Sequence, residues 1–162
     1  GYCYVCAWEK GGRTFIVSLL GCGWPNHKNY KWSDTEKLLS FGDYNFDYKT
    51  YWQEPQAKRI LVTDGAADNR EIGAEVYLRG KCSVTAQDRK KEILLRKGET
   101  VTCRTEIPSK VTAPVLAGAK LGRIAYYLDG KLIDAYPVYA EKSVEKISFK
   151  WYAEKVFHDF FH

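Results

Sequence analysis

The chain has 162 residues, of which 45% are hydrophobic and 28% are charged, and its formal net charge is +5. This length accommodates one ordinary domain, or a small domain with an appendage. The composition is typical of a globular protein and argues against long disordered stretches. No uncharged apolar run reaches about 18 residues, so we expect no helix that spans a bilayer.

The first 42 residues predict two strands followed by a helix. Residues 2–8 are rich in aromatic and β-compatible side chains, and residues 15–20 form a nearly continuous apolar run, which is typical of a strand buried on both faces. Ser33 and Glu36 have the spacing of a capping box, and Gly42 occupies the position of a C-terminal cap. Two strands and one helix cannot cover an apolar strand on both faces. We therefore expect this segment to pack against partners outside the present sequence.

Residues 57–140 carry β signals throughout. Turn-forming pairs that contain glycine punctuate the region, and no helical periodicity interrupts it. The candidate strands are residues 59–63, 75–78, 83–86, 93–96, 100–106, 110–113, 123–128 and 131–139. Many short strands with regularly spaced turns favour a small antiparallel β-sandwich over a parallel sheet with crossover helices.

The sharpest local signal in this region is the dipeptide Asp129-Gly130, which lies between two β-rich runs. It predicts a two-residue type I′ hairpin, in which both central residues adopt positive φ. The resulting register places Tyr126 opposite Ile133. Pro137 lacks an N–H donor, so we expect its strand to lie at an edge of the sheet or to end there.

The residues after 142 change character and predict an amphipathic helix. From Phe149 onward, apolar side chains recur at helical spacing, with charged residues mostly on the other side. Such a helix either covers the protein's own sheet or lies at a membrane interface, and composition alone leaves both open. The candidate membrane-contact residues are Trp151, Phe157, Phe160 and Phe161.

Two patterns resemble reactive sites but lack the context of one. Ser143-Val144-Glu145-Lys146 matches Ser-x-x-Lys, yet this serine, like Ser33, is better explained as a helix N-cap. Cys3, Cys6, Cys22 and His27 offer the residue types of a zinc site. A strand, however, directs residues i and i+3 to opposite faces, so Cys3 and Cys6 would not converge on one ion. We expect no catalytic residue, no metal site and no cofactor in this chain.

Basic residues are concentrated between residues 79 and 97, which contain seven Lys and Arg against two acidic residues. Such a run either solvates a pair of strands around a turn or attracts an anionic partner. No recognised nucleic-acid-binding motif accompanies the charge, so we do not expect nucleic acid as a partner.

Three blocks together resemble one family. Gly1-Tyr2-Cys3 with residues 13–21 and 31–42 is similar to the end of a penicillin-binding, transpeptidase-type domain. Residues 113–122, running into Leu128-Asp129-Gly130-Lys131, look like the C-terminal β-domain of low-molecular-mass penicillin-binding proteins, the bacterial serine-type D-alanyl-D-alanine carboxypeptidases. An amphipathic tail completes the order of segments in that family.

The resemblance implies a mainly β chain in three parts. Residues 1–52 would be the strand-strand-helix end of an α/β catalytic domain, residues 53–142 the β-sandwich domain, and residues 143–162 the amphipathic helix. The family's nucleophilic serine and its partner motifs all precede the position that matches Gly1. This chain is therefore expected to be inactive alone. Lys31 is the one residue here to which the resemblance gives a role, and it does so weakly. It stands where the family often places an arginine that receives the substrate's terminal carboxylate.

The resemblance also implies a biological setting. The enzyme would act at the extracytoplasmic face of the bacterial cell membrane on peptidoglycan stem peptides, and the β-domain would position the catalytic domain relative to the membrane or to partners. The helical tail would contact the membrane surface, and strands within residues 2–20 could pair with a second copy. The alternative is a non-catalytic cell-surface β-module that binds an anionic wall polymer or protein partners.

Overall fold

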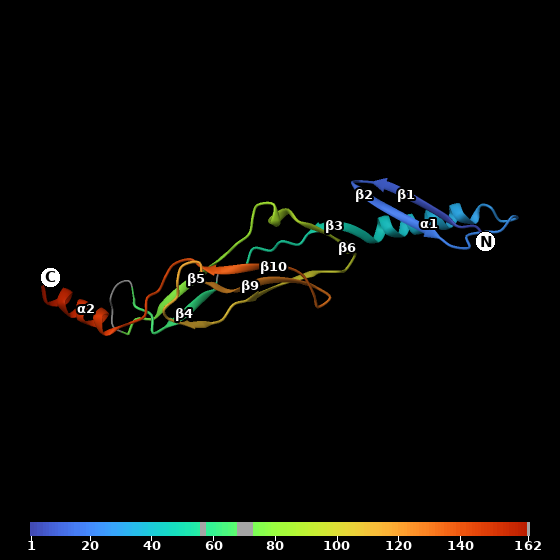
Figure 1. The fold of residues 1–162 in the computed structure, drawn as a ribbon. Coiled ribbons are helices and arrows are strands. Elements are labelled where there is room, and N and C mark those ends of the chain that lie inside the picture. Colours follow the sequence, from blue (N-terminus) through green and yellow to red (C-terminus); the bar gives the residue numbers. More distant parts are fainter. Residues whose placement is uncertain (56–57, 68–72, 162) are drawn as a thin grey trace. The chain divides into compact units, whose positions relative to one another are not determined.

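A computed structural model describes residues 1–55, 58–67 and 73–161, without the side chains of residues 158, 159 and 161. The chain divides into two compact units, residues 1–49 with 92–99, and residues 50–91 with 100–162. Strands predominate in both units, and the two helices flank the main sheet in the sequence (Figure 1). The mainly β class, with a strand-strand-helix segment before the β-domain and a helix after it, is confirmed.

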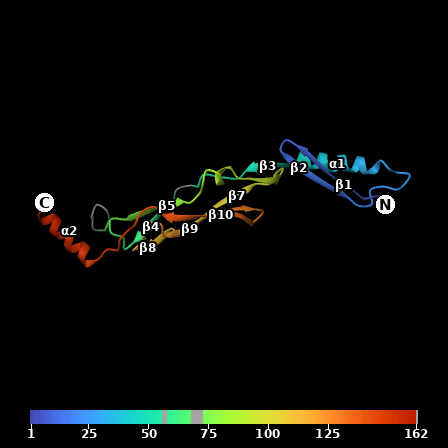
Figure 2. The ribbon, with the colours of Figure 1, turned by 45° about the horizontal axis from the view of Figure 1, so that its top comes forward.

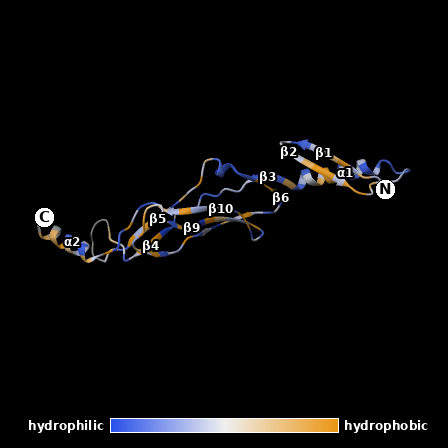
Figure 3. Cartoon of the chain, viewed as in Figure 1, coloured by the Kyte–Doolittle hydropathy of each residue, from blue (hydrophilic) through white to orange (hydrophobic). Residues whose placement is uncertain are grey.

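The first unit begins with an antiparallel hairpin of β1 (Tyr4–Lys10) and β2 (Arg13–Leu19). Its side chains alternate, so that one face is largely covered and the other is open. On the open face Val5 is 65%, Ile16 76% and Leu20 84% exposed, and hydrophobic residues run along β2 (Figure 3). These apolar side chains have no cover among the described residues.

Helix α1 (Tyr30–Asn45) packs against β2, and it is longer than predicted at both ends. Ser33 is not the N-cap, because its hydroxyl donates a hydrogen bond to the carbonyl of Tyr30 inside the first turn. Gly42 does not end the helix either. A Cβ atom at Gly42 would lie 2.9 Å from the ring of Phe15 on β2, so glycine here permits the close approach of helix and strand.

A further small sheet completes this unit. Strand β3 (Phe46–Thr50) follows α1 directly and pairs with β6 (Glu92–Arg96). The sequence had predicted no strand in residues 43–52, because their mixture of aromatic and polar side chains lacks a clear alternation.

The second unit, which we call the β unit, is built on one six-stranded sheet (Figures 1 and 2). Its spatial order is β7-β9-β10-β5-β4-β8, and every neighbouring pair is antiparallel except β4–β8, a parallel pair that the sequence did not predict. The strands are β4 (Arg59–Thr63), β5 (Val76–Cys82), β7 (Val101–Glu106), β8 (Lys110–Thr112), β9 (Lys120–Leu128) and β10 (Lys131–Ala140). Residues 83–86 were expected to be a strand, but they lead instead into the short 3-10 helix η1 (Asp88–Lys90).

The apolar residues of one sheet face, together with the loops that cross it, form a core. Burial alternates along β4 and β5, so that Ile60, Val62, Val76 and Leu78 point inward. The cluster is completed by Ala113, Val115, Ala140 and Val144.

The β9–β10 hairpin forms as predicted at its turn, where Asp129 has φ +48° and Gly130 has φ +77°. The predicted register was wrong further along, because an irregularity between Leu132 and Asp134 shifts the pairing. Tyr126 is therefore opposite Asp134 and not Ile133.

The expectation for Pro137 was also wrong, because β10 lies between β9 and β5. The pairing with β5 covers only Val138 to Ala140. No N–H donor toward β5 is therefore needed at Pro137, and its carbonyl accepts a hydrogen bond from the N–H of Ser83.

The tail is helical only from Phe149, as α2 (Phe149–Phe161). Ser143 is not an N-cap. Its hydroxyl accepts a hydrogen bond from the N–H of Ala117 at 2.8 Å, and the neighbouring Val144 is buried in the core of the β unit. Ser148 instead accepts the N–H of Trp151 at 3.3 Å, the N-cap type of contact. Neither helix in the described part of the chain is long and apolar enough to cross a membrane.

Candidate functional site

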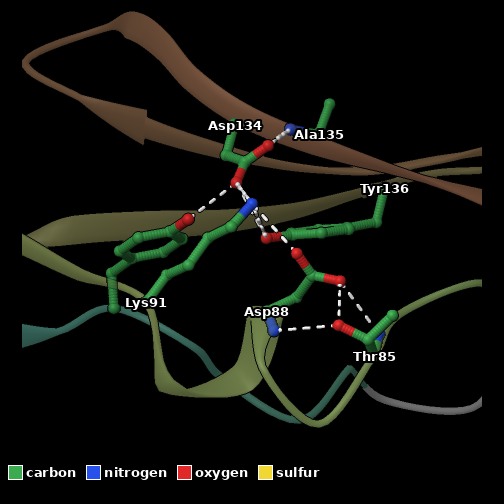
Figure 4. A network of polar contacts seen from close by, with 7 residues as sticks. Thr85, Asp88, Lys91, Asp134, Ala135 and Tyr136 are labelled. Carbon is green, nitrogen blue, oxygen red and sulfur yellow. Dashed lines mark hydrogen bonds and ion pairs between the residues drawn. The ribbon is translucent and has the colours of Figure 1, made fainter.

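A polar network on the β unit is centred on the carboxylate of Asp134 on β10 (Figure 4). Its Oδ2 accepts hydrogen bonds from the hydroxyls of Tyr51 and Tyr136, at 2.7 and 2.8 Å, and from the ammonium of Lys91 at 3.2 Å. Its Oδ1 accepts the N–H of Ala135 at 2.8 Å. Burial by itself would raise the pKa of Asp134, but these donors outweigh it and lower that pKa below its usual range.

The same network holds the turn that contains η1. The carboxylate of Asp88 accepts the hydroxyl and the N–H of Thr85, at 2.6 and 2.9 Å, and lies 3.0 Å from the Lys91 ammonium. The bonds from Thr85, followed by that from Lys91, lower the pKa of Asp88 to about 2. The pKa of Lys91 is raised, chiefly by its bond to Asp88. Lys91 thus links Asp88 in the turn to Asp134 on β10, so the network connects the turn to the sheet.

A cavity of about 300 Å³ lies next to this turn. Its lining combines apolar strand residues with the cations Lys58, Lys81 and Arg89. The guanidinium of Arg89 lies 5.6 Å from the ring centroid of Trp52 and 3.7 Å from the carboxylate of Glu54. A cavity with this lining can bind an anionic or aromatic group.

The lining of the cavity includes the thiol of Cys82. Cys82 is the candidate nucleophile in its lining, and burial raises the pKa of that thiol, which disfavours the reactive thiolate. The part of the lining that the structure describes contains no histidine, and the described residues contain no group of three or more His, Cys, Asp and Glu side chains placed to hold a metal ion.

The structure places Lys31 in the first turn of α1, in the first unit. Its ammonium lies 4.7 Å from the ring centroid of Trp32 and 5.7 Å from that of Tyr4. Cation–π contacts therefore help to fix this charge at the start of the helix. An ammonium offers charge to a carboxylate but not the bidentate fork of an arginine.

The predicted membrane-contact residues do not lie on one face of α2. Trp151 and Phe160 are nine residues apart, which at 3.6 residues per turn places them on opposite sides of the helix. Phe157 is 66% and Phe160 81% exposed, whereas Trp151 is half-buried and its ring lies edge-on to that of Tyr152. The side chain of Phe161 falls outside the described residues.

The apolar face of α2 includes two residues that were not in the predicted membrane-contact set. Phe149 and Val156, which belong to the helical spacing of apolar residues in the sequence, lie on the same side as Phe160 and are 89% and 52% exposed. Positions 149, 153, 156 and 160 follow the i, i+4, i+7, i+11 pattern of one stripe. No comparable signal in the sequence points to the Asp134 network, whose partners lie up to 83 residues apart.

Part of the chain matches a known protein family. Residues 72–146 match the model of the family described as the penicillin-binding protein 5, C-terminal domain. The D-alanyl-D-alanine carboxypeptidase DacF of Bacillus subtilis strain 168 is 24% identical over 162 residues, which cover 98% of this chain and 38% of DacF. The chain thus spans about two fifths of the length of this curated relative.

Two solved structures also resemble the chain. The D-alanyl-D-alanine carboxypeptidase DacD from Francisella tularensis has a TM-score of 0.46 at 17% identity, covering 91% of this chain and 34% of DacD. Penicillin-binding protein 5 from Haemophilus influenzae has a TM-score of 0.38 at 23% identity, covering 90% of this chain and 39% of that protein. Scores below 0.5 do not carry residue roles from these structures to this chain.

Proposed function

We propose that the chain is the C-terminal part of a D-alanyl-D-alanine carboxypeptidase and that it serves such an enzyme at the outer face of a bacterial membrane. The match over residues 72–146 is the observation that carries the proposal. In this proposal the β unit positions a catalytic domain that acts on peptidoglycan stem peptides. The nucleophile belongs to that domain, so the chain alone is inactive.

The first unit supports this proposal through its uncovered apolar surface. Val5, Ile16 and Leu20 project from one face of the β1–β2 hairpin. An apolar face of this kind is normally buried in a larger sheet or under helices. We propose that the rest of the catalytic domain covers it, and that in its absence two copies of the hairpin can associate. Lys31, at the start of α1, would supply charge to the substrate's carboxylate.

Helix α2 supports contact with a membrane surface. Its exposed face carries Phe149, Val156, Phe157 and Phe160, and burying one such phenylalanine contributes about 1.5 to 3 kcal/mol. Several side chains of this kind are sufficient for reversible docking of a helix that lies in the interface without crossing it. We propose that this face, more than Trp151, contacts the lipid.

Co-sedimentation of the full chain with anionic liposomes tests the proposal. The double variant Phe157→Glu with Phe160→Glu removes two aromatic side chains from the apolar face. We expect its partition coefficient to fall about 100-fold or more, because roughly 3 kcal/mol of apolar burial is lost and two charges must approach the acyl region.

A control of equal charge separates apolar docking from simple electrostatic attraction. Lys150→Gln with Lys155→Gln lowers the net charge by two, as the phenylalanine variants do, but leaves the apolar face intact. We expect this control to bind within about threefold of the wild type, since each lysine near an anionic surface contributes at most about 1 kcal/mol and screening reduces that value. Equal binding by the phenylalanine double variant and the wild type would refute the membrane role of α2.

A further inference from the structure

The register of the main sheet brings two arginines face to face. Arg59 on β4 is directly opposite Arg79 on β5 in the antiparallel pair. Both side chains are exposed and lie on the sheet face away from the core, because their neighbours Ile60 and Leu78 point inward. Directly opposed residues of like charge destabilise a strand pair. Repulsion between the two guanidinium groups therefore destabilises this part of the sheet, and an anion bound between them would relieve that repulsion.

Three lysines extend this surface across five strands. Lys81 on β5 is opposite Tyr139 on β10, which in turn is opposite Lys120 on β9. On the other side Lys110 on β8 is the partner of Leu61 on β4. We call the surface formed by Arg59, Arg79, Lys81, Lys110 and Lys120 the cationic face. All five side chains are exposed, and within the described part of the chain none of them forms an ion pair with a carboxylate.

Two carboxylates border the cationic face and do not neutralise it. Glu141 follows β10, and its N–H donates to the carbonyl of Arg79. Glu75 precedes β5 and accepts the hydroxyl of Tyr77 at 2.7 Å. The five cations of the cationic face and these two carboxylates together carry a net charge of +3.

The surroundings of these charges suit an extended polar chain. A shallow groove of about 450 Å³ at this end of the face is lined by the polar residues Lys81, Ser83 and Glu141 together with Cys82, Gly118, Tyr139 and Ala140. Thr63 and Thr112, which pair across β4 and β8, add hydroxyl groups at the other end of the face. This face carries the ring of Tyr77, which is 43% exposed, but among the described residues it has no exposed phenylalanine like those of α2, so it offers less apolar surface for insertion into lipid.

We propose that the cationic face binds a linear polymer that carries repeated anionic phosphate groups. Guanidinium groups match phosphate oxygens in a bidentate fork, and strands about 4.8 Å apart with same-face residues about 6.7 Å apart present the charges as a grid along which repeated phosphates can lie. The inference stands apart from the carboxypeptidase proposal and from the membrane role of α2, because it uses neither the catalytic domain nor the tail.

Binding of the full chain to linear polyphosphate, titrated between about 50 and 200 mM salt, tests the proposal. The double variant Arg59→Gln with Arg79→Gln should bind about 10- to 30-fold more weakly at the low-salt end. Its logarithmic salt dependence should also be shallower by about 1.4, as expected when two phosphate contacts are lost. Its thermal stability should equal or exceed that of the wild type, because a repulsive cross-strand pair is removed.

The matched control is Lys90→Gln with Lys131→Gln, which lowers the net charge by the same amount from positions in η1 and at the start of β10. The control should bind polyphosphate within about threefold of the wild type. Equal losses in the two double variants would overturn the proposal, since binding would then depend on overall charge. Absence of polyphosphate binding at low salt would overturn it too, as would tighter binding to polyglutamate than to polyphosphate. If the Arg59 and Arg79 double variant loses liposome binding although its α2 is intact, the face binds lipid and the proposal is overturned.

Discussion

Removing the carboxylate of Asp134 should destabilise the β unit much more than removing its ionic partner. In Asp134→Ala, the hydroxyls of Tyr51 and Tyr136 lose the oxygen to which they donate, at 2.7 and 2.8 Å. These tyrosines are 8% and 6% exposed, so water replaces the acceptor poorly. Hydrogen bonds to a charged acceptor contribute about 1.5 to 3 kcal/mol each, and the two hydroxyls can partly satisfy each other. We expect a loss of about 3 kcal/mol in the free energy of unfolding.

Lys91→Met is the matching variant, which removes the cation of the network and leaves the carboxylate of Asp134 in place. The side chain of Lys91 is 46% exposed, and solvent screens its pairs with Asp88 and Asp134, so we expect a much smaller loss of stability than for Asp134→Ala. Urea unfolding followed through backbone amide signals of β9 and β10 measures the β unit separately from the first unit. If Lys91→Met costs as much as Asp134→Ala, the ion pair dominates and the argument from buried hydroxyls is refuted.

Two further perturbations probe the same unit. The pKa of Asp88 is lowered to about 2 in the folded state, so its stabilising contribution is complete above its unfolded pKa of about 3.9 and is lost as the pH falls toward 2. Asp88→Asn should therefore flatten the fall of the melting temperature between about pH 4 and pH 2, and an unchanged profile would contradict this assignment. Gly122→Ala should destabilise the unit by about 2 kcal/mol or more in urea, because the added Cβ would overlap the backbone carbonyl of Glu106 on β7. A cost below about 0.5 kcal/mol would show that the strands can separate to admit it.

The features that the sequence predicted well are those decided by neighbouring residues. The Asp129-Gly130 turn depends on the φ angles that these two residues adopt, and both are positive as expected. The helical character of α2 follows from the spacing of its apolar residues, although the helix begins at Phe149 and not at the predicted Ser143. Strand β4 likewise has the predicted bounds, because a short β-branched and apolar run lies between polar residues.

The errors arose where tertiary contacts decide the outcome. Gly42 has the sequence context of a helix cap, but the ring of Phe15 on β2 requires a residue without a side chain there. Ser143 has the context of an N-cap, but the N–H of Ala117 uses its hydroxyl. The shift in β10 changes the partner of Tyr126, and nothing in the hairpin turn specifies such an irregularity. The neighbouring residues in the sequence predicted one role for each of these residues. Contacts with residues that are distant in the sequence give each of them a different role in the structure.

The basic run at residues 79–97 shows how folding redistributes charges that are contiguous in the sequence. Lys91 bridges Asp88 and Asp134, Arg89 lies over Trp52, and the ammonium of Lys97 is 3.2 Å from the ring centroid of Tyr44. The first residues of the run, Arg79 and Lys81, instead join Arg59, Lys110 and Lys120 from other strands. A binding surface defined by the run would thus include cations already engaged within the protein and omit three that the sheet brings together. Strand register, which a single sequence specifies only weakly, therefore decides which charges are available to a partner.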